Sequence, residues 1–183
     1  MHKLETARLI LRPFAADDLD ALAEINRDPQ VIRFIGDGKP QSKEKTATRL
    51  NGYLEHGRRH AFGFWAALEK TTRDMVGFCG LQFLENTAEV ELGYRLARRA
   101  WGIGLATEGA VASLRYGFDE LKLDRIVAVV HPENVASQRV VEKIGLTYEK
   151  DAHYYGMNLR YYTIARETYA PDGSLYLCTS SEI

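Results

Sequence analysis

The most informative part of the chain is the stretch Glu91-Leu-Gly-Tyr-Arg-Leu-Ala-Arg-Arg-Ala-Trp-Gly-Ile-Gly-Leu-Ala-Thr-Glu108. It sets a glycine-bearing turn between a strand pattern and the start of an amphipathic helix. Gly102 and Gly104 let backbone N–H groups crowd toward one point, and the helix beginning near Leu105 adds unpaired N–H groups and the positive end of its dipole. This geometry suits a pyrophosphate. Glycine can also merely relieve strain in an ordinary strand-to-helix turn, and the spacing alone leaves both interpretations open.

Two better-known phosphate motifs do not fit this turn. A dinucleotide-binding Gly-x-Gly-x-x-Gly needs a third glycine, where this chain has Thr107. The turn also follows a strand meander instead of opening the first βαβ unit of the chain. A Walker A loop is excluded because the sequence has no Gly-Lys-Ser/Thr.

Upstream of the turn, the chain alternates strand and helix signals. Asp17 and Asp18 provide cap and first-turn acids for a helix that stops before Pro29, and Ser42 caps a second helix that runs to about His56 and ends at Gly57. Strands are predicted at residues 9–14, 62–68, 75–84 and 89–96. The last three strands form an antiparallel meander.

Downstream of the turn, a helix with Val111, Leu114 and Phe118 on one face precedes an apolar strand at residues 125–130. Because a helix joins this strand to the one at residues 89–96, the two should be parallel. A helix from Asn134 to about Gly145 and strands at 146–150 and 159–166 follow. Residues 171–183 have no clear pattern.

Composition narrows the class of protein. The 183 residues carry 24 basic against 25 acidic side chains, interspersed, so nothing marks a nucleic-acid binder. The two cysteines show no metal-ligand spacing, and no metal is expected. The first residues lack a signal-peptide pattern, and no run reaches the roughly 18 apolar residues of a membrane span. One cytoplasmic domain without a membrane partner is the expectation.

Several motifs resemble one family. Arg99-Ala-Trp-Gly102-Ile-Gly104 resembles the coenzyme A signature of GNAT acetyltransferases, Arg/Gln-x-x-Gly-x-Gly/Ala. Its flanks, Glu91-Leu-Gly-Tyr and Ala106-Thr107-Glu108, resemble the RimJ/RimL-like branch. So do Glu5-Thr-Ala-Arg8-Leu-Ile-Leu-Arg12-Pro13-Phe, Gly77-Phe-Cys-Gly80-Leu and Asn134-x-x-Ser137-x-x-Val140-x-Glu-Lys143-x-Gly145. The resemblance covers roughly residues 4 to 168. It departs at Ile103, where a basic residue is common, and at Gly109, where alanine is usual.

The resemblance implies an α/β (α+β) fold. A mixed, mostly antiparallel sheet of about seven strands would have a parallel central pair splayed around acetyl-CoA, with about four flanking helices. Residues 1–170 would form the single acetyltransferase domain, and 171–183 a tail of unknown structure.

The resemblance also implies the cofactor site. The backbone of the turn would hold the pyrophosphate, and the strand backbone at Tyr94 and Leu96 would pair with the pantetheine arm. The turn residues assigned to acetyl-CoA are Arg99, Ala100, Trp101, Gly102, Ile103, Gly104, Ala106 and Thr107.

Asn134 and Ser137 allow two interpretations. At a helix start they form a modest capping pair, each side chain serving the other's backbone. In enzymes that the chain resembles, the asparagine side chain binds the pantetheine amide and the hydroxyl lies near the sulfur. Ser137 would then hydrogen-bond or protonate the departing thiolate.

The acceptor amine needs a base, because an ammonium ion cannot attack a thioester. Glu91 is the first candidate, since strand alternation places Glu89, Glu91, Gly93 and Arg95 on one face of the strand. A structural ion pair with a nearby arginine is the alternative role for Glu91. His131 is the second candidate base because imidazole titrates near neutrality, although a histidine before proline is often a loop residue. A bulge at Gly93 is expected to free a backbone N–H for the oxyanion.

Fold and cofactor do not determine the acceptor. The RimJ/RimL resemblance favours a protein or peptide N-terminal α-amine, with direct attack in a ternary complex. Polyamines, amino acids and aminoglycosides are the alternative acceptors. Two alternative functions are not enzymatic: a non-catalytic acetyl-CoA sensor and a nucleotide-binding regulator. Members of this family are often dimers, so a homodimer is a further expectation.

Overall fold

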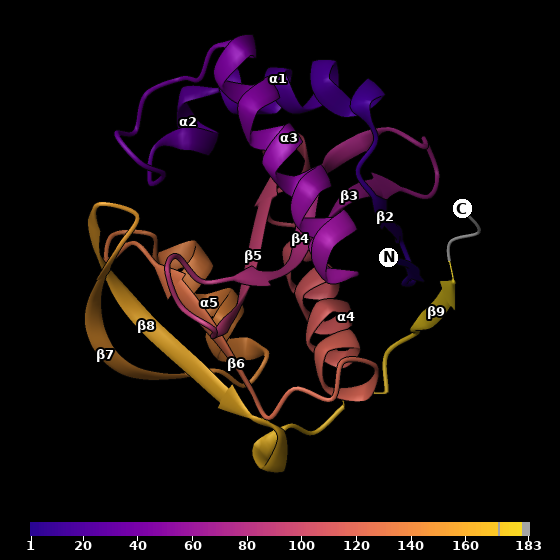
Figure 1. Ribbon diagram of the computed structural model, residues 1–183, viewed down its shortest axis with the longest axis vertical. Coiled ribbons are helices and arrows are strands. Elements are labelled where there is room, and N and C mark those ends of the chain that lie inside the picture. The colour runs from indigo at the N-terminus through magenta and orange to yellow at the C-terminus, as the bar shows by residue number, and fades with distance from the viewer. Residues whose placement is uncertain (172, 181–183) are drawn as a thin grey trace.

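Nine strands form one sheet in the order β7-β8-β6-β5-β4-β3-β2-β1-β9 (Figure 1). The computed structural model describes residues 1–171 and 173–180. The strands are β1 (His2–Glu5), β2 (Leu9–Pro13), β3 (Phe64–Glu69), β4 (Met75–Phe83), β5 (Val90–Leu96), β6 (Arg125–Val130), β7 (Thr147–Tyr154), β8 (Met157–Ala165) and β9 (Leu177–Ser180). The α-helices are α1 (Leu19–Arg27), α2 (Pro29–Ile32), α3 (Lys43–His60), α4 (Leu105–Asp119) and α5 (Val135–Lys143).

The expected mixed sheet is confirmed. Strands β2 to β5 run as an antiparallel meander, and β5 and β6, joined by α4, are parallel. The two central strands meet at one register position, Glu91 opposite Val127. Strand β6 then pairs antiparallel with β8, and β8 with β7.

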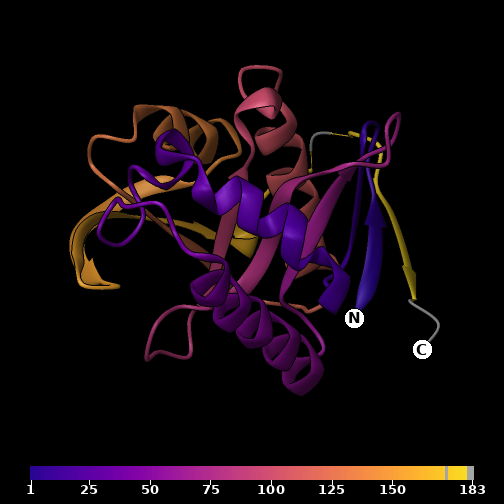
Figure 2. The ribbon, with the colours of Figure 1, turned by 90° about the horizontal axis from the view of Figure 1, so that it is seen from above.

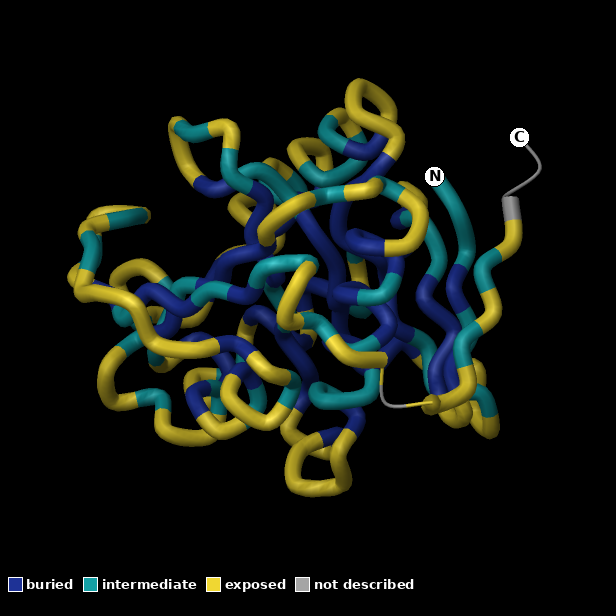
Figure 3. The backbone as a smooth tube through the Cα atoms, turned by 90° about the horizontal axis from the view of Figure 1, so that it is seen from below, coloured by how far each residue is buried: buried dark blue, intermediate teal, exposed yellow. Residues whose placement is uncertain are grey.

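The two faces of the sheet bury different helices. Cys79, Leu81 and Leu92 point into the cluster that holds the buried side chains of α4, and Val141 of α5 joins it. Phe64 and Phe78 point the other way, against Leu22 of α1 and Leu50 of α3. Figure 2 shows α4 and α5 on one side of the sheet and α3 on the other. In Figure 3 the buried backbone follows the central strands.

The end of α3 differs from the prediction. The helix does not stop at Gly57 but continues to His60, and Ala61 takes the left-handed conformation (φ 62°) with its N–H donating to the Gly57 carbonyl. Gly57 is buried inside the helix, where a Cβ would lie 2.5 Å from the sulfur of Met1. Here glycine allows close packing, and the conformational role that was expected of it falls to Ala61.

Both ends of the chain extend the sheet beyond the expected seven strands. β1 pairs with β2, and β9, from the segment without a sequence pattern, pairs antiparallel with β1. The first and the last strand of the chain therefore lie side by side (Figure 1). The fifth helix, beyond the four expected, is the short α2 that opens at Pro29. Within residues 1–171 and 173–180, no helix is long and apolar enough to cross a membrane.

Candidate active site

A cavity of about 390 Å³ opens where β5 and β6 separate. After the single pair Glu91–Val127, no further pairing between the two strands is found in the described part of the chain. Side chains from both layers reach the cavity, including Glu91 and Arg95 of β5, Ser137 of α5, His131 and Tyr155. The cavity thus joins the two faces of the sheet at the point where the sequence places the chemistry.

The backbone of β5 offers hydrogen-bonding groups to this opening. Ala97 N–H donates to Val76 O, and Leu84 N–H to Glu89 O. Hydrogen-bonded and non-bonded pairs alternate in an antiparallel ladder, so the odd-numbered residues of β5 turn their backbone groups to β4. The backbone N–H and C=O groups of Tyr94 and Leu96 therefore point away from β4, toward the space from which β6 has diverged. The expected bulge at Gly93 is wrong, because the β4–β5 register is continuous. Strand divergence frees these groups instead.

Glu91 is a buried carboxyl at the edge of the cavity. Its side chain is 5% exposed and accepts hydrogen bonds from Gln82 Nε2 (2.6 Å) and the Tyr155 hydroxyl (2.5 Å). Burial raises the pKa of Glu91 to about 7, and nearby Glu85 pushes in the same direction, while the two hydrogen bonds oppose the rise. Glu91 makes no ion pair with the residues that the structure describes. It can therefore exchange a proton near neutral pH.

Tyr155 reaches Glu91 from the tip of the β7–β8 hairpin. Tyr155 and Gly156 both have positive φ (54° and 73°), as a two-residue hairpin turn requires. The Tyr155 backbone N–H also donates to Glu85 Oε2 (2.5 Å). Tyr155 is not among the site residues predicted from the sequence. The Tyr-Gly pair between two strand patterns was the available signal for a tight turn, but nothing in the sequence fixes where its tip lands.

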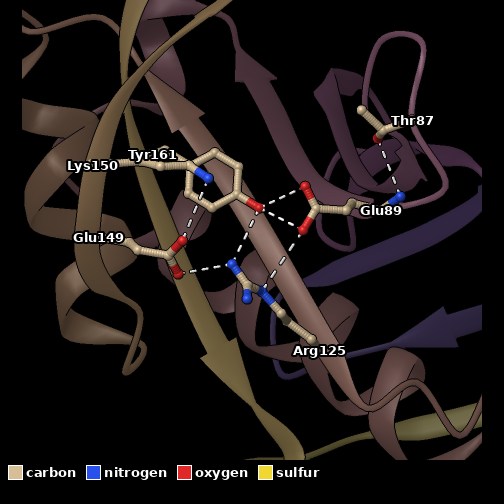
Figure 4. A network of polar contacts seen from close by, with 6 residues as sticks. All are labelled: Thr87, Glu89, Arg125, Glu149, Lys150 and Tyr161. Carbon is tan, nitrogen blue, oxygen red and sulfur yellow. Dashed lines mark hydrogen bonds and ion pairs between the residues drawn. The ribbon is translucent and has the colours of Figure 1, made fainter.

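The ion pair considered for Glu91 belongs to Glu89, two residues earlier. Glu89 accepts both contacts of the Tyr161 hydroxyl (2.7 Å each), and Arg125 Nε lies 3.8 Å from its carboxylate. Arg125 also bonds Glu149 (2.8 Å), and Lys150 Nζ sits 4.8 Å from the centre of the Tyr161 ring (Figure 4). This network links the start of β5 to β6, β7 and β8, on the N-terminal side of the Glu91–Val127 pair after which β5 and β6 separate.

Ser137 and Tyr94 form a hydroxyl pair on the opposite side of the opening. The two oxygens lie 2.9 Å apart, and the Tyr94 hydroxyl also donates to the Ser137 carbonyl (3.2 Å). Asn134 Oδ1 caps α5 by accepting from the Ser137 N–H (3.2 Å). The reciprocal half of the expected capping pair is wrong, because the Ser137 hydroxyl turns to Tyr94. Asn134 keeps its amide N–H donors for another partner.

His131 lines the cavity at the end of β6. Its ring stacks on Phe34 with centroids 5.1 Å apart, and Nδ1 accepts the Glu133 N–H (3.2 Å). A neutral ring whose Nδ1 accepts carries its proton on Nε2. In this arrangement His131 offers the cavity a donor and no free base, which favours Glu91 as the base.

The glycine turn has the geometry of an anion site. Gly102 and Gly104 have φ of 74° and 85°, and Gly104 is the N-cap of α4 without any side-chain cap. A cap would otherwise satisfy the first N–H groups of the helix. A Cβ on Gly102 would meet nothing within 4 Å, so the turn is open to a ligand. Trp101 and Ile103 are exposed beside it, and Ala106 and Thr107 lie half-buried in the first turn of α4.

Three of the residues that were predicted to bind the cofactor make contacts within the protein, and these contacts hold the turn in place. Arg99 Nη2 donates to Met75 O (2.8 Å), and Ala100 is buried. The indole of Trp101 donates to the Leu96 carbonyl (2.7 Å), which leaves the Leu96 N–H as the group that faces the opening. The prediction assigned the backbone of these residues to the pyrophosphate, and the side chains of Arg99 and Trp101 make internal contacts that position that backbone.

Arg8 was not predicted as a site residue, yet it braces the turn. Its Nη1 donates to the Ile103 carbonyl (2.7 Å), and its Nε pairs with Glu108 Oε2 (2.7 Å). Glu108 also accepts from the Thr6 hydroxyl. A positive charge thus lies beside the turn although position 103 carries isoleucine. The sequence signals that could have identified Arg8 were its place in the opening-strand motif and the presence of Glu108 in the motif after the turn.

Comparisons with known proteins agree with this geometry. Residues 8–147 match the family model described as an acetyltransferase (GNAT) domain. The chain is 37% identical to the uncharacterized protein YkkB of Bacillus subtilis, over 81% of this chain and 87% of that protein. It is 30% identical to the uncharacterized N-acetyltransferase p20 of Bacillus licheniformis, over 82% of this chain and 84% of that protein.

A solved structure of an acetyltransferase has the same fold as this chain. The crystal structure of a GNAT-family acetyltransferase from Bacillus anthracis superposes with a TM-score of 0.77 at 28% identity, covering 90% of this chain and 99% of that one. The fold is thus that of an acetyltransferase, and the chain belongs to the GNAT family of N-acetyltransferases.

Proposed function

We propose that this acetyltransferase moves the acetyl group of acetyl-CoA directly to a primary amine in a ternary complex, and that the amine is a protein or peptide N-terminal α-amine. The observation that carries the proposal is Glu91, a buried carboxyl with a pKa near 7 at the opening between β5 and β6. A base that titrates at neutral pH, next to a slot for a thioester, is what amine acetylation needs.

The donor side is supported by the α4 face of the opening. The uncapped start of α4 and the open turn at Gly102 would hold the pyrophosphate, and Arg8, which is paired with Glu108, would hold the turn in place through the Ile103 carbonyl. The backbone of Tyr94 and Leu96 would take the pantetheine arm as an added strand. Acetyl-CoA supplies the activated acetyl group.

Glu91 acts on the acceptor side. It would accept a proton from the incoming ammonium, directly or through a water, and hold it beside Tyr155 and Gln82. The Tyr94 N–H, freed by strand divergence, would donate to the oxyanion. The Ser137 hydroxyl, which Tyr94 orients, would give the departing thiolate a proton or a hydrogen bond.

An α-amine fits this base better than a lysine side chain does. A peptide α-amine has a pKa of about 7.7–8.0 and is partly neutral at pH 7, whereas a lysine amine near ~10.4 is almost wholly protonated. A carboxylate of pKa about 7 is too weak to deprotonate a lysine amine efficiently. The RimJ/RimL-like motifs point to the same acceptor.

The test is release of free coenzyme A thiol from acetyl-CoA with N-terminal peptides, polyamines, amino acids and aminoglycosides. Gly104→Asp is the control, because it places a carboxylate where the pyrophosphate would lie. We expect turnover with peptide α-amines that the control loses. Turnover confined to polyamines or aminoglycosides would refute the assigned acceptor, and acetyl-CoA binding without turnover would favour a sensor.

A further inference from the structure

We infer that the acceptor carries an anionic group, a carboxylate, which binds Arg95 and Arg49 while its amine reaches Glu91. The inference rests on the proposed function and adds a second recognition element to it. Both arginines line the same cavity as Glu91.

Arg95 is a buried cation without an anion. Its side chain is 8% exposed, and no carboxylate within the described residues forms an ion pair with it. Nη1 donates to Asn26 Oδ1 (2.5 Å), and the guanidinium carbon lies 5.2 Å from the centre of the Phe78 ring. Nε is buried and has no hydrogen-bond partner. Because burying an unpaired charge is costly, a ligand that supplies the missing charge would be bound strongly.

Arg49 adds a second cation to this part of the cavity. It lies on α3, is half-buried, and makes no ion pair with any residue that the structure describes. Burial lowers the pKa of Arg95 to about 10, and the nearby charge of Arg49 contributes to that lowering. Two like charges that face one cavity repel each other until an anion is placed between them.

The opposite end of the cavity is acidic. Glu85 and Glu91 line it there, and Tyr155 links the two carboxylates. Glu91 and Arg95 lie on one face of β5, four residues or about 13 Å apart. Gly93 stands between them without a side chain, and a Cβ there would collide with the Phe64 ring at 2.8 Å. The cavity is therefore dipolar, and the Phe64 ring packs against β5 between its two poles.

This charge pattern specifies an acceptor class. An ammonium at the Glu91 end and a carboxylate toward Arg95 describe either a free amino acid or a peptide with an acidic side chain in its first two residues. The shared chemistry is an amine and a carboxylate on the same molecule. A polyamine or an aminoglycoside, which carries only positive charge, would meet the arginines unfavourably.

The experiment compares matched acceptors. Thiol release would be measured with the peptides Ser-Asp-Gly-Gly, Ser-Asn-Gly-Gly and Asp-Gly-Gly-Gly, all C-terminally amidated, and with free serine and glutamate. We expect kcat/KM to be about 10- to 100-fold higher for an acidic peptide than for its neutral match, the effect of a charged hydrogen-bonded pair. Preference for the free amino acids would identify those as the source of the carboxylate.

Variants assign the preference to the arginines. Arg95→Gln and the more exposed Arg49→Gln should each bring the ratio of kcat/KM for the acidic peptide to kcat/KM for its neutral match close to one. Arg58→Gln is the matched control, because it removes the same charge from the exposed end of α3, outside the cavity. Thermal unfolding would verify that Arg95→Gln folds, and Arg49→Gln provides the test if it does not.

Two outcomes overturn the inference in distinguishable ways. Equal turnover of acidic and neutral peptides, unchanged in Arg49→Gln, would refute the anion site and leave the acetyltransferase proposal standing. No turnover of any acceptor would refute both.

Discussion

Two glutamates separated by one residue illustrate how much the position of a side chain decides. Glu89, just before β5, is tied to Arg125 and Tyr161, whereas Glu91, at the position where β5 pairs with β6, lines the cavity with only neutral partners. Alternation predicted the shared face but not this division of roles, because β8 and the hairpin tip supply the partners. A carboxyl without a cation, nearly buried, is the one whose pKa moves toward neutrality.

Replacing Glu91 with glutamine tests its role as the base. The amide keeps the shape of the side chain but accepts no proton, so we expect kcat to fall about 10²- to 10⁴-fold. Wild-type kcat/KM should rise with pH around a midpoint near 7, and the variant should lose this limb. Rates measured from pH 5.5 to 9 would show both effects. A Glu91→Gln enzyme that kept the wild-type pH profile would leave proton removal to water.

Ser137→Ala tests the hydroxyl pair. A thiolate is a fair leaving group, so we expect a rate loss of about 3- to 30-fold without abolition, since one hydrogen bond is removed. Tyr94→Phe, which removes the hydroxyl that orients Ser137, should have a comparable and non-additive effect. Steady-state kinetics of the two single variants and the double variant measure this coupling. Full additivity, or unchanged turnover in Ser137→Ala, would remove the pair from the mechanism.

At the scale of elements, the sequence predicted what local patterns encode and missed what depends on distant contacts. The glycine turn, the cap at Ser42 and the parallel β5–β6 pair follow from nearby residues and were found. The splayed strand pair was expected from the family resemblance, but the free backbone N–H was attributed to a local bulge, whereas the β4–β5 register is continuous and β6 pairs onward with β8. The β7–β8 hairpin was expected, yet its contact with Glu91 spans 64 positions in sequence and left no local signal.

Tyr155→Phe tests what that hairpin does for the base. The Tyr155 hydroxyl lowers the pKa of Glu91 by donating to it, so its loss should raise that pKa further. We expect the midpoint of the acid limb to move up by about half to one pH unit, with little change in the plateau rate. Tyr154→Phe is the control, since it removes an adjacent hydroxyl that does not contact Glu91. A midpoint that moves down in Tyr155→Phe would contradict the assignment.

In the molecule as a whole, the centre of the sheet holds the candidate active site, and the strands from the two ends of the chain extend one edge of the sheet. β5 and β6 leave each other at the point where a continuous sheet would be most stable, while β1 and β9 add strands at the far edge. Composition could not reveal β9, because its four residues follow an irregular segment and pair only with the N-terminus. The open centre is also where Glu91 and Arg95 are buried without counter-charges, so stability as well as activity should depend on their charge state.

The pH dependence of unfolding tests this link. The pKa of Glu91 is about 7 in the folded protein and 4.5 ordinarily, so its stabilising contribution is complete below pH 4.5 and is lost as pH rises through 7. At ~1.4 kcal/mol per pH unit, the loss is at most about 3 kcal/mol.

The half-buried His56 acts in the opposite sense. Its pKa is lowered by burial, so its contribution appears as pH rises and is lost as pH falls. Wild type and Glu91→Gln share His56, and the difference between them isolates Glu91. Urea unfolding at pH 5 and pH 8 should show Glu91→Gln gaining on wild type by about 1–3 kcal/mol between the two. A constant difference would mean that Glu91 is already charged in the folded protein across this range, which would refute the raised pKa on which its proposed role rests.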